Sequence, residues 1–129
     1  MAENILSVEK LKIGFWNEKR VLTAVEDISF EVQKGKTLCI VGESGCGKSV
    51  TSMSIMRLLP KATTKIEADE IILNGKNIAN YSDKEMAQVR GTGIGMIFQD
   101  SMTSLNPVKT IGKQLDEAFI VHHSWDKNE

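Results

Sequence analysis

The octapeptide Gly-Glu-Ser-Gly-Cys-Gly-Lys-Ser at residues 42–49 restricts the possible folds more than any other feature of the chain. It fits G-x-x-x-x-G-K-S/T, in which glycines let backbone N–H groups approach phosphate oxygens that a Cβ would obstruct. Residues 37–41 before it form an apolar run, typical of a strand covered on both faces. After it, helical spacing runs from Lys48 to Leu59, and Pro60 ends the helix. Strand, glycine loop and helix in this order predict an α/β fold with a phosphate-binding loop.

The rest of the chain predicts further strands and helices. Alternating apolar residues indicate strands, the pair Asn74-Gly75 between apolar residues indicates a hairpin, and Ser82 with Glu85 forms a capping box that opens a helix. The stretch before the hairpin has no clear period and predicts a loop. The expected elements are strands over 11–16, 25–32, 37–41 and 94–98, a loop over 62–70, a hairpin over 71–78, and helices over 48–59, 82–90 and after Pro107. The last helix is expected to be amphipathic, with Ile111, Leu115, Ala118 and Phe119 on one face.

Charge and composition argue against two classes of protein. The 16 lysines and arginines nearly balance 17 aspartates and glutamates, and a net charge of -1 gives no basic field for nucleic acid. No apolar run approaches the roughly 20 residues that span a bilayer, and no secretory signal pattern opens the chain, so we expect a soluble, cytoplasmic protein. Cys39 and Cys46 have neither CxxC spacing nor a partner cluster, so neither a disulfide framework nor a zinc site is indicated.

Three side chains carry groups suited to nucleotide chemistry. Lys48 would reach the β- and γ-phosphates as a mobile charge, and the Ser49 hydroxyl would be a hard oxygen ligand for Mg²⁺. Gln99 directly follows the apolar run 94–98, where its amide oxygen could contact Mg²⁺ or orient an attacking water. A glutamine at a strand end is also common as an ordinary polar loop residue, so this position alone leaves both interpretations open.

Three segments together resemble one family, the ATP-binding subunits of ABC transporters, and most closely those that drive oligopeptide and dipeptide import. The segments are GESGCGKS, TAVEDISFEVQKGKTLCIVGESG and VRGTGIGMIFQDSMTSLNPVKTIGKQL. The similarity runs from about Leu6 to Val121, and S-L-N-P after the glutamine is typical of the peptide and nickel group. The resemblance implies an α/β fold: part of a P-loop NTPase core, with a mixed sheet whose N-terminal portion is antiparallel, the P-loop helix and the start of a helical subdomain.

The resemblance also implies roles for individual residues. Lys48 and Gln99 would act in catalysis, Ser49 and Gln99 would hold Mg²⁺, and Phe15 would stack on adenine, a contact worth about 1–3 kcal/mol. Phe15 also continues the apolar face of its strand, so a core position is the alternative, with Trp16 as the substitute for stacking. The expected nucleotide-binding residues are Gly42, Glu43, Ser44, Gly45, Cys46, Gly47, Lys48, Ser49, Val50 and Phe15.

Parts of a complete ABC ATPase are missing from this sequence. The Asp-Glu pairs at 69–70 and 116–117 do not follow apolar strands as a Walker B motif would, no SGG signature occurs, and His122 and His123 are expected to be solvated. We therefore expect residues 1–129 to be the N-terminal portion of an ABC-type nucleotide-binding domain, with ATP and Mg²⁺ as ligands and negligible hydrolysis by this chain alone. An open apolar edge would leave the fold marginally stable.

The resemblance further implies partners and a place of action. An importer ATPase would contact transmembrane permease subunits and a second ATPase subunit, and would lie peripherally on the cytoplasmic face of the cell membrane. Two alternatives stay open. One is a non-catalytic nucleotide-binding module; the other is a small-molecule P-loop kinase, which would need an arginine-rich lid, whereas Arg20, Arg57 and Arg90 do not cluster along the sequence.

Overall fold

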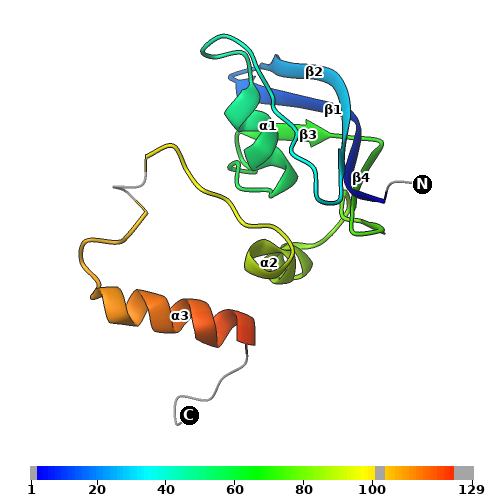
Figure 1. Cartoon of the computed structure of the whole chain (residues 1–129). Coiled ribbons are helices and arrows are strands. Elements are labelled where there is room, and N and C mark those ends of the chain that lie inside the picture. The colour runs from blue at the N-terminus through cyan, green and yellow to red at the C-terminus, as the bar shows by residue number, and fades with distance from the viewer. Residues whose placement is uncertain (1–2, 101–103, 124–129) are drawn as a thin grey trace. The chain divides into compact units, whose positions relative to one another are not determined.

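The computed structural model describes residues 3–100 and 104–123, which divide into two compact units, one up to Met86 and one from Ala87. The first unit holds a sheet with the helix α1 (Lys48–Ile55), and the second holds the helix α3 (Ile111–His123) (Figure 1). Within the described residues, none of the helices has the length and apolar character needed to cross a membrane.

Two long strands that form one hairpin organise the sheet. β1 (Asn4–Asn17) and β2 (Arg20–Gln33) pair antiparallel along their length and turn at Glu18, where φ is +51°. β1 also pairs antiparallel with β3 (Thr64–Glu67) and β4 (Glu70–Leu73), and β4 pairs with β5 (Lys76–Asn77). β1 is therefore the central strand of the order β2-β1-β4-β5 (Figure 1).

The core of the first unit lies between this sheet and α1, which covers one face of it (Figure 1). Leu11 and Ile13 in β1 have no exposed surface, because β1 has neighbours on both edges. Burying one such side chain stabilises a fold by about 1.5–3 kcal/mol. The buried apolar residues are Val8, Leu11, Ile13, Val25, Ile55, Met56, Ile71, Ile78 and Met86.

The structure confirms the predicted α/β class and several of its elements. Residues 11–16 and 25–32 lie in β1 and β2, and the hairpin turns at Asn74 and Gly75 with φ of +47° and +77°, which the primed two-residue turns require. The prediction of a loop over 62–70 was wrong, because β3 forms within it. Its four residues pair with β1 about fifty positions earlier, and no local period signals such a partner.

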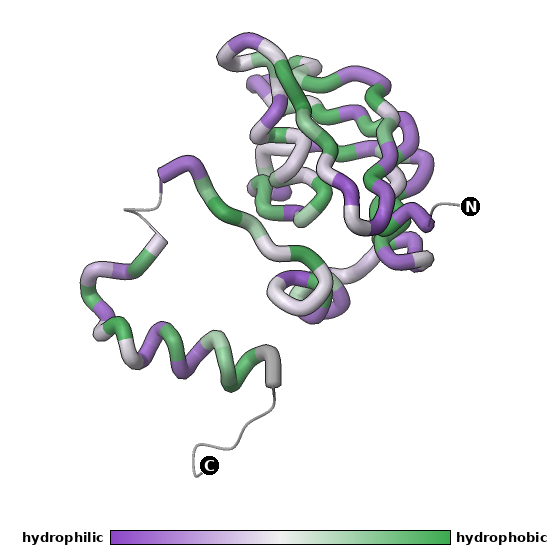
Figure 2. Tube along the Cα trace, viewed as in Figure 1, coloured by the Kyte–Doolittle hydropathy of each residue, from purple (hydrophilic) through white to green (hydrophobic). Residues whose placement is uncertain are grey.

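The predicted strands at 37–41 and 94–98 do not form in the described residues. Segment 37–41 pairs with no strand there, and segment 94–98 has only one isolated bridge, between Arg90 and Ile94. Both segments are apolar (Figure 2), yet Val41 is 89% and Ile97 95% exposed. A strand of this composition needs neighbours on both edges, and the described chain supplies none. The ladders among residues 3–100 and 104–123 are all antiparallel, so the described part of the chain does not form the parallel portion of the predicted mixed sheet.

The helices agree with the prediction at their starts more than at their ends. α1 ends at Ile55 instead of Leu59, because Arg57 adopts a left-handed backbone with φ +51°. α2 (Asp83–Thr92) starts after the predicted cap and loses helical geometry at Arg90 and Gly91. The expected solvation of His122 and His123 concerns side chains outside the described part of the structure.

The apolar face of α3 is largely solvent-exposed. The predicted stripe of Ile111, Leu115, Ala118 and Phe119 lies on this helix and is exposed, with Ile111, Leu115 and Phe119 at 62%, 56% and 49%. Ile111, Leu115 and Phe119 are spaced four apart and Ala118 lies three after Leu115, so they share one helix face. The amphipathic helix was therefore predicted correctly, and the residues that should be covered are solvent-exposed in the described structure.

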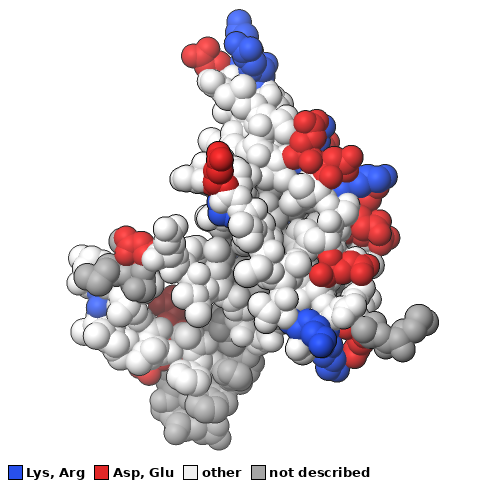
Figure 3. All heavy atoms as spheres, turned by 45° about the horizontal axis from the view of Figure 1, so that its top comes forward, with Lys and Arg blue, Asp and Glu red and all other residues white. Residues whose placement is uncertain are grey.

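Surface charges on the first unit are paired locally. Lys10 lies 2.8 Å from Asp69 and Lys12 lies 3.3 Å from Glu26, and on the face shown in Figure 3 acidic and basic side chains stand side by side. The hydrogen bond and charge of the Asp69 carboxylate raise the pKa of Lys10. Pairs this exposed contribute little to stability. They leave no single-sign patch on this face, in keeping with the balanced composition.

The start of α2 provides a pH-dependent contact. Glu85 Oε2 accepts hydrogen bonds from the Ser82 hydroxyl at 2.6 Å and the Ser82 backbone N–H at 2.7 Å, and the Glu85 N–H donates back to Ser82 Oγ at 3.3 Å. The predicted capping box is thus confirmed. The hydrogen bonds from the Ser82 hydroxyl and backbone lower the pKa of the Glu85 carboxyl.

Replacing Glu85 with glutamine should remove part of the acid sensitivity of folding. Because the pKa is lower in the folded state, this contribution is complete above about pH 4.3, the ordinary value for glutamate, and is lost as the pH falls through the folded-state pKa. Urea unfolding midpoints measured from pH 3 to pH 7 should fall less steeply on the acid side for Glu85→Gln. Glu31→Gln, a change at an exposed carboxylate of β2, should keep the original slope; equal slopes in all three proteins would contradict the assignment.

Candidate phosphate-binding site

The loop at 42–49 makes a tight path that ends at the first residue of α1. Gly45 and Gly47 both have left-handed backbones, with φ of +81° and +95°, and Gly47 is the N-cap of the helix. A Cβ on Gly47 would lie 2.7 Å from Val25 Cγ2 and 3.2 Å from the Ala24 carbonyl oxygen. Both the backbone angle and the close approach to β2 therefore require glycine at this position.

The side chain of Lys48 is held inside the loop. Its Nζ donates to the carbonyl oxygens of Gly42 at 2.8 Å and Glu43 at 2.6 Å, and it lies 3.5 Å from Cys46 Sγ. These contacts use the three donors of an ammonium group. The positive charge is therefore positioned by the loop backbone at the place where the helix starts.

Several N–H groups of the loop and of the first turn of α1 are unpaired. Within the described chain, Cys46 N–H donates to the Glu43 carbonyl at 3.3 Å, whereas the N–H groups of Gly45 and Gly47 have no backbone acceptor, and those of Lys48 and Ser49 belong to the first turn of α1. The first N–H groups of a helix always lack helical partners, and the helix dipole makes this end favourable for negative charge. Together with Lys48 they form a site suited to phosphate oxygens.

Two hydroxyls that the sequence did not single out anchor the helix. Thr51 and Ser54 are 3% and 1% exposed, so the buried face of α1 includes polar residues beside Ile55. Thr51 Oγ1 donates to the Gly47 carbonyl at 2.9 Å, and Ser54 Oγ donates to the Thr51 carbonyl at 2.7 Å. Because each hydroxyl bonds to the helix itself, it can be buried without a further partner. The signal available in the sequence was their spacing of three, which places them on one helix face.

The metal candidates are single oxygen donors. Ser49 is exposed in the first turn of α1, and Gln99 is exposed in the second unit. Among the described residues, no three His, Cys, Asp or Glu side chains cluster in a way that would hold a metal ion. Mg²⁺ in nucleotide sites takes most of its ligands from phosphate and water, so one hydroxyl beside the phosphate site fits that ion.

The stacking candidates differ in exposure. Phe15 is half-buried and lies opposite Leu22 in β2 and Thr64 in β3, while its neighbour Trp16 is 52% exposed. Phe15 thus has strand neighbours on both sides, as a core residue would, and still presents part of its ring. Cys39 and Cys46, the two thiols, are free and exposed.

Comparison with known proteins places these features in a family. A family model described as ABC transporter matches residues 25–129. A probable peptide ABC transporter ATP-binding protein of Sinorhizobium fredii is 50% identical over 121 residues, which cover 94% of this chain and 36% of the relative. A dipeptide transport ATP-binding protein of Bacillus subtilis is 49% identical over 125 residues, 97% of this chain and 37% of the relative. A glutathione import ATP-binding protein of Shigella flexneri is 42% identical over 133 residues, and the match covers 99% of this chain and 21% of the relative. The chain therefore spans about a third or less of the length of these relatives.

Proposed function

We propose, because this chain belongs to the ABC transporter family, that it binds ATP as the N-terminal part of an ATPase subunit that powers import of oligopeptides or dipeptides. The observation that carries the proposal is the loop at 42–49, which holds the Lys48 ammonium and ends in the unpaired N–H groups at the start of α1. The peptide class is supported by relatives named for peptide and dipeptide transport. A relative named for glutathione import makes a small thiol peptide the second candidate.

In this proposal different residues contact the phosphates, the Mg²⁺ ion and the adenine of the nucleotide. The N–H groups of Gly45, Gly47, Lys48 and Ser49 donate hydrogen bonds to the phosphate oxygens, with Gly42, Glu43, Ser44, Cys46 and Val50 completing the contact surface. Lys48 turns from its two carbonyl partners toward the β- and γ-phosphates. The hydrogen bonds to the carbonyls are then replaced by bonds in which both the donor and the acceptor are charged. Mg²⁺, when bound with the nucleotide, neutralises phosphate charge, and Ser49 and Gln99 are the proposed protein ligands. Phe15 is the proposed partner for adenine.

The wider setting belongs to the same proposal. Residues 1–129 would form the N-terminal portion of the nucleotide-binding domain, working with transmembrane permease subunits and a second ATPase subunit on the cytoplasmic side of the membrane. Hydrolysis by this chain alone would be negligible, since no Asp-Glu pair of the sequence follows an apolar strand where it could activate water.

Calorimetric titration with Mg-ATP and AMP tests the proposal. If the loop is the main attachment point, AMP should bind about 10–100-fold more weakly, because each charge-assisted bond to a missing phosphate contributes about 1.5–3 kcal/mol. Tripolyphosphate with Mg²⁺, which lacks a base, should compete with ATP. Equal affinity for ATP and AMP, or no competition by tripolyphosphate, would show that the loop does not hold the ligand.

A further inference from the structure

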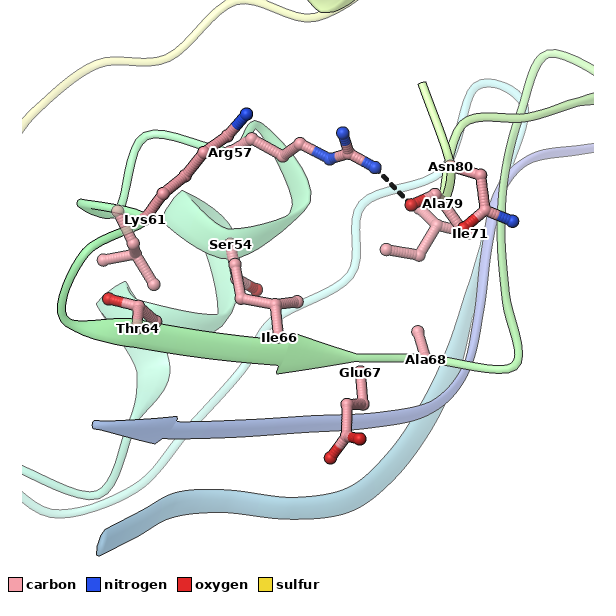
Figure 4. A pocket seen from close by; sticks show the side chains of 11 residues that line it. Ser54, Arg57, Lys61, Thr64, Ile66, Glu67, Ala68, Ile71, Ala79 and Asn80 are labelled. Carbon is pink, nitrogen blue, oxygen red and sulfur yellow. Dashed lines mark hydrogen bonds between the residues drawn. The ribbon is translucent and has the colours of Figure 1, made fainter. Parts of the chain in front are cut away.

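A cavity lies at the opposite end of α1 from the phosphate loop. It has a volume of about 410 Å³ and opens between the end of α1 and the strands β3 and β4, entirely within the first unit (Figure 4). Ser54 on the helix and Thr64 and Ile66 on β3 lie on its facing walls. This volume falls in the range of small-molecule sites, about 300–1,000 Å³.

One polar atom in the wall of this cavity, Thr64 Oγ1, lacks a hydrogen-bond partner among the described residues. Thr64 lines the cavity, is only 9% exposed, and its Oγ1 is buried without a hydrogen-bond partner in the described structure. A buried hydroxyl in that state is destabilising, because it has given up water without gaining a protein partner. Ser54 does not supply the partner, because its hydroxyl donates to the Thr51 carbonyl at 2.7 Å. A bound molecule with a hydroxyl or carbonyl group would satisfy Thr64.

The charged side chains around the cavity already have partners. Arg57 donates to the carbonyl oxygens of Tyr81 and Ala79, and to that of Ile78 at 3.4 Å; Figure 4 shows the contact with Ala79. Lys61 lies 2.6 Å from Asp83. Glu67, the remaining charged wall residue, lies 3.0 Å from Lys65. Each of these three charged wall residues therefore already has a partner, and an uncharged ligand needs none of them.

The rest of the wall is apolar apart from the amide of Asn80. Leu59, Ile66 and Ile71 contribute branched side chains, and Ala68 and Ala79 leave the open volume. We propose that this cavity binds a small uncharged molecule with an apolar body and a single hydroxyl or carbonyl group, which Thr64 Oγ1 contacts. The site is separate from the phosphate loop and does not depend on the function proposed for it.

Benzyl alcohol is a suitable probe, with benzoate and benzylammonium as charged analogues of nearly the same shape. In methyl NMR spectra of the full chain, benzyl alcohol should shift the signals of Ile66 and Ile71 in a saturable way, and the two charged analogues should not. Thr64→Val keeps the shape and removes the hydroxyl, so it should weaken binding about tenfold. Lys48→Ala should leave binding unchanged, which separates this site from nucleotide binding.

A blocking variant gives an independent test. Ala68→Leu adds an isobutyl group to the wall and should abolish the shifts while the chain stays folded. Non-saturable shifts, equal shifts with benzoate, or unchanged binding in both Thr64→Val and Ala68→Leu would overturn the proposal and leave ordered water as the partner of Thr64.

Discussion

Lys48→Ala should weaken Mg-ATP binding by about 10–100-fold while the chain stays folded. The ammonium lies inside the loop beside the carbonyl oxygens of Gly42 and Glu43, so only a local turn of the side chain is needed to bring it to the phosphates. Hydrogen bonds between an ammonium and phosphate contribute about 1.5–3 kcal/mol, which corresponds to this range of affinities. Titration calorimetry of the variant against Mg-ATP measures the effect directly.

The matched control is Lys36→Ala. It removes the same charge from an exposed lysine outside the loop, so a general electrostatic effect on the nucleotide would appear in both variants. Only Lys48→Ala should lose affinity, and both should unfold at similar urea concentrations, since the carbonyls left by Lys48 are exposed and water can bond to them. Equal losses in the two variants would contradict the proposed role of Lys48.

The elements predicted correctly from the sequence are those whose signals are local. The Asn74-Gly75 turn, the Ser82 and Glu85 cap and the period of α3 each lie within a few residues, and the structure has all three. Segment 37–41 was predicted to be a strand and forms none, whereas β3 forms in a segment predicted to be a loop. Both errors have the same cause, which is that strand formation depends on a pairing partner. An apolar run becomes a strand only beside other strands, and a polar segment becomes one when a partner such as β1 is available.

In the candidate site, too, the features with a local sequence signal were predicted and the contacts with distant segments were not. The motif predicted the loop, its glycines and its lysine, because phosphate binding requires those residues at those spacings. It did not predict which elements the loop contacts. The approach of Gly47 to Val25 in β2, and the burial of Thr51 and Ser54, follow from how α1 packs on a sheet far away in sequence. Patterns in a single sequence carry no record of such contacts.

Gly47→Ala should destabilise the chain by about 2–5 kcal/mol. A left-handed backbone at a non-glycine residue costs about 1–2 kcal/mol, and φ here is +95°. The added Cβ would also lie 2.7 Å from Val25 Cγ2 and 3.2 Å from the Ala24 backbone oxygen, so overpacking adds about 1–3 kcal/mol. Many domains have a total stability of only about 5–15 kcal/mol, so urea unfolding should show a large decrease in midpoint.

Gly45→Ala separates the two causes. Gly45 has a similar φ of +81°, but a Cβ there would meet nothing within 4 Å, so this variant carries the backbone cost alone. The difference between the two variants measures the contact between the loop and β2. The double variant Gly47→Ala with Val25→Ala should recover part of that difference relative to Val25→Ala, because the methyl group at 2.7 Å is then absent. If Gly45→Ala and Gly47→Ala lose the same stability, the loop does not pack on β2, and the start of α1 would have to be positioned by its own backbone.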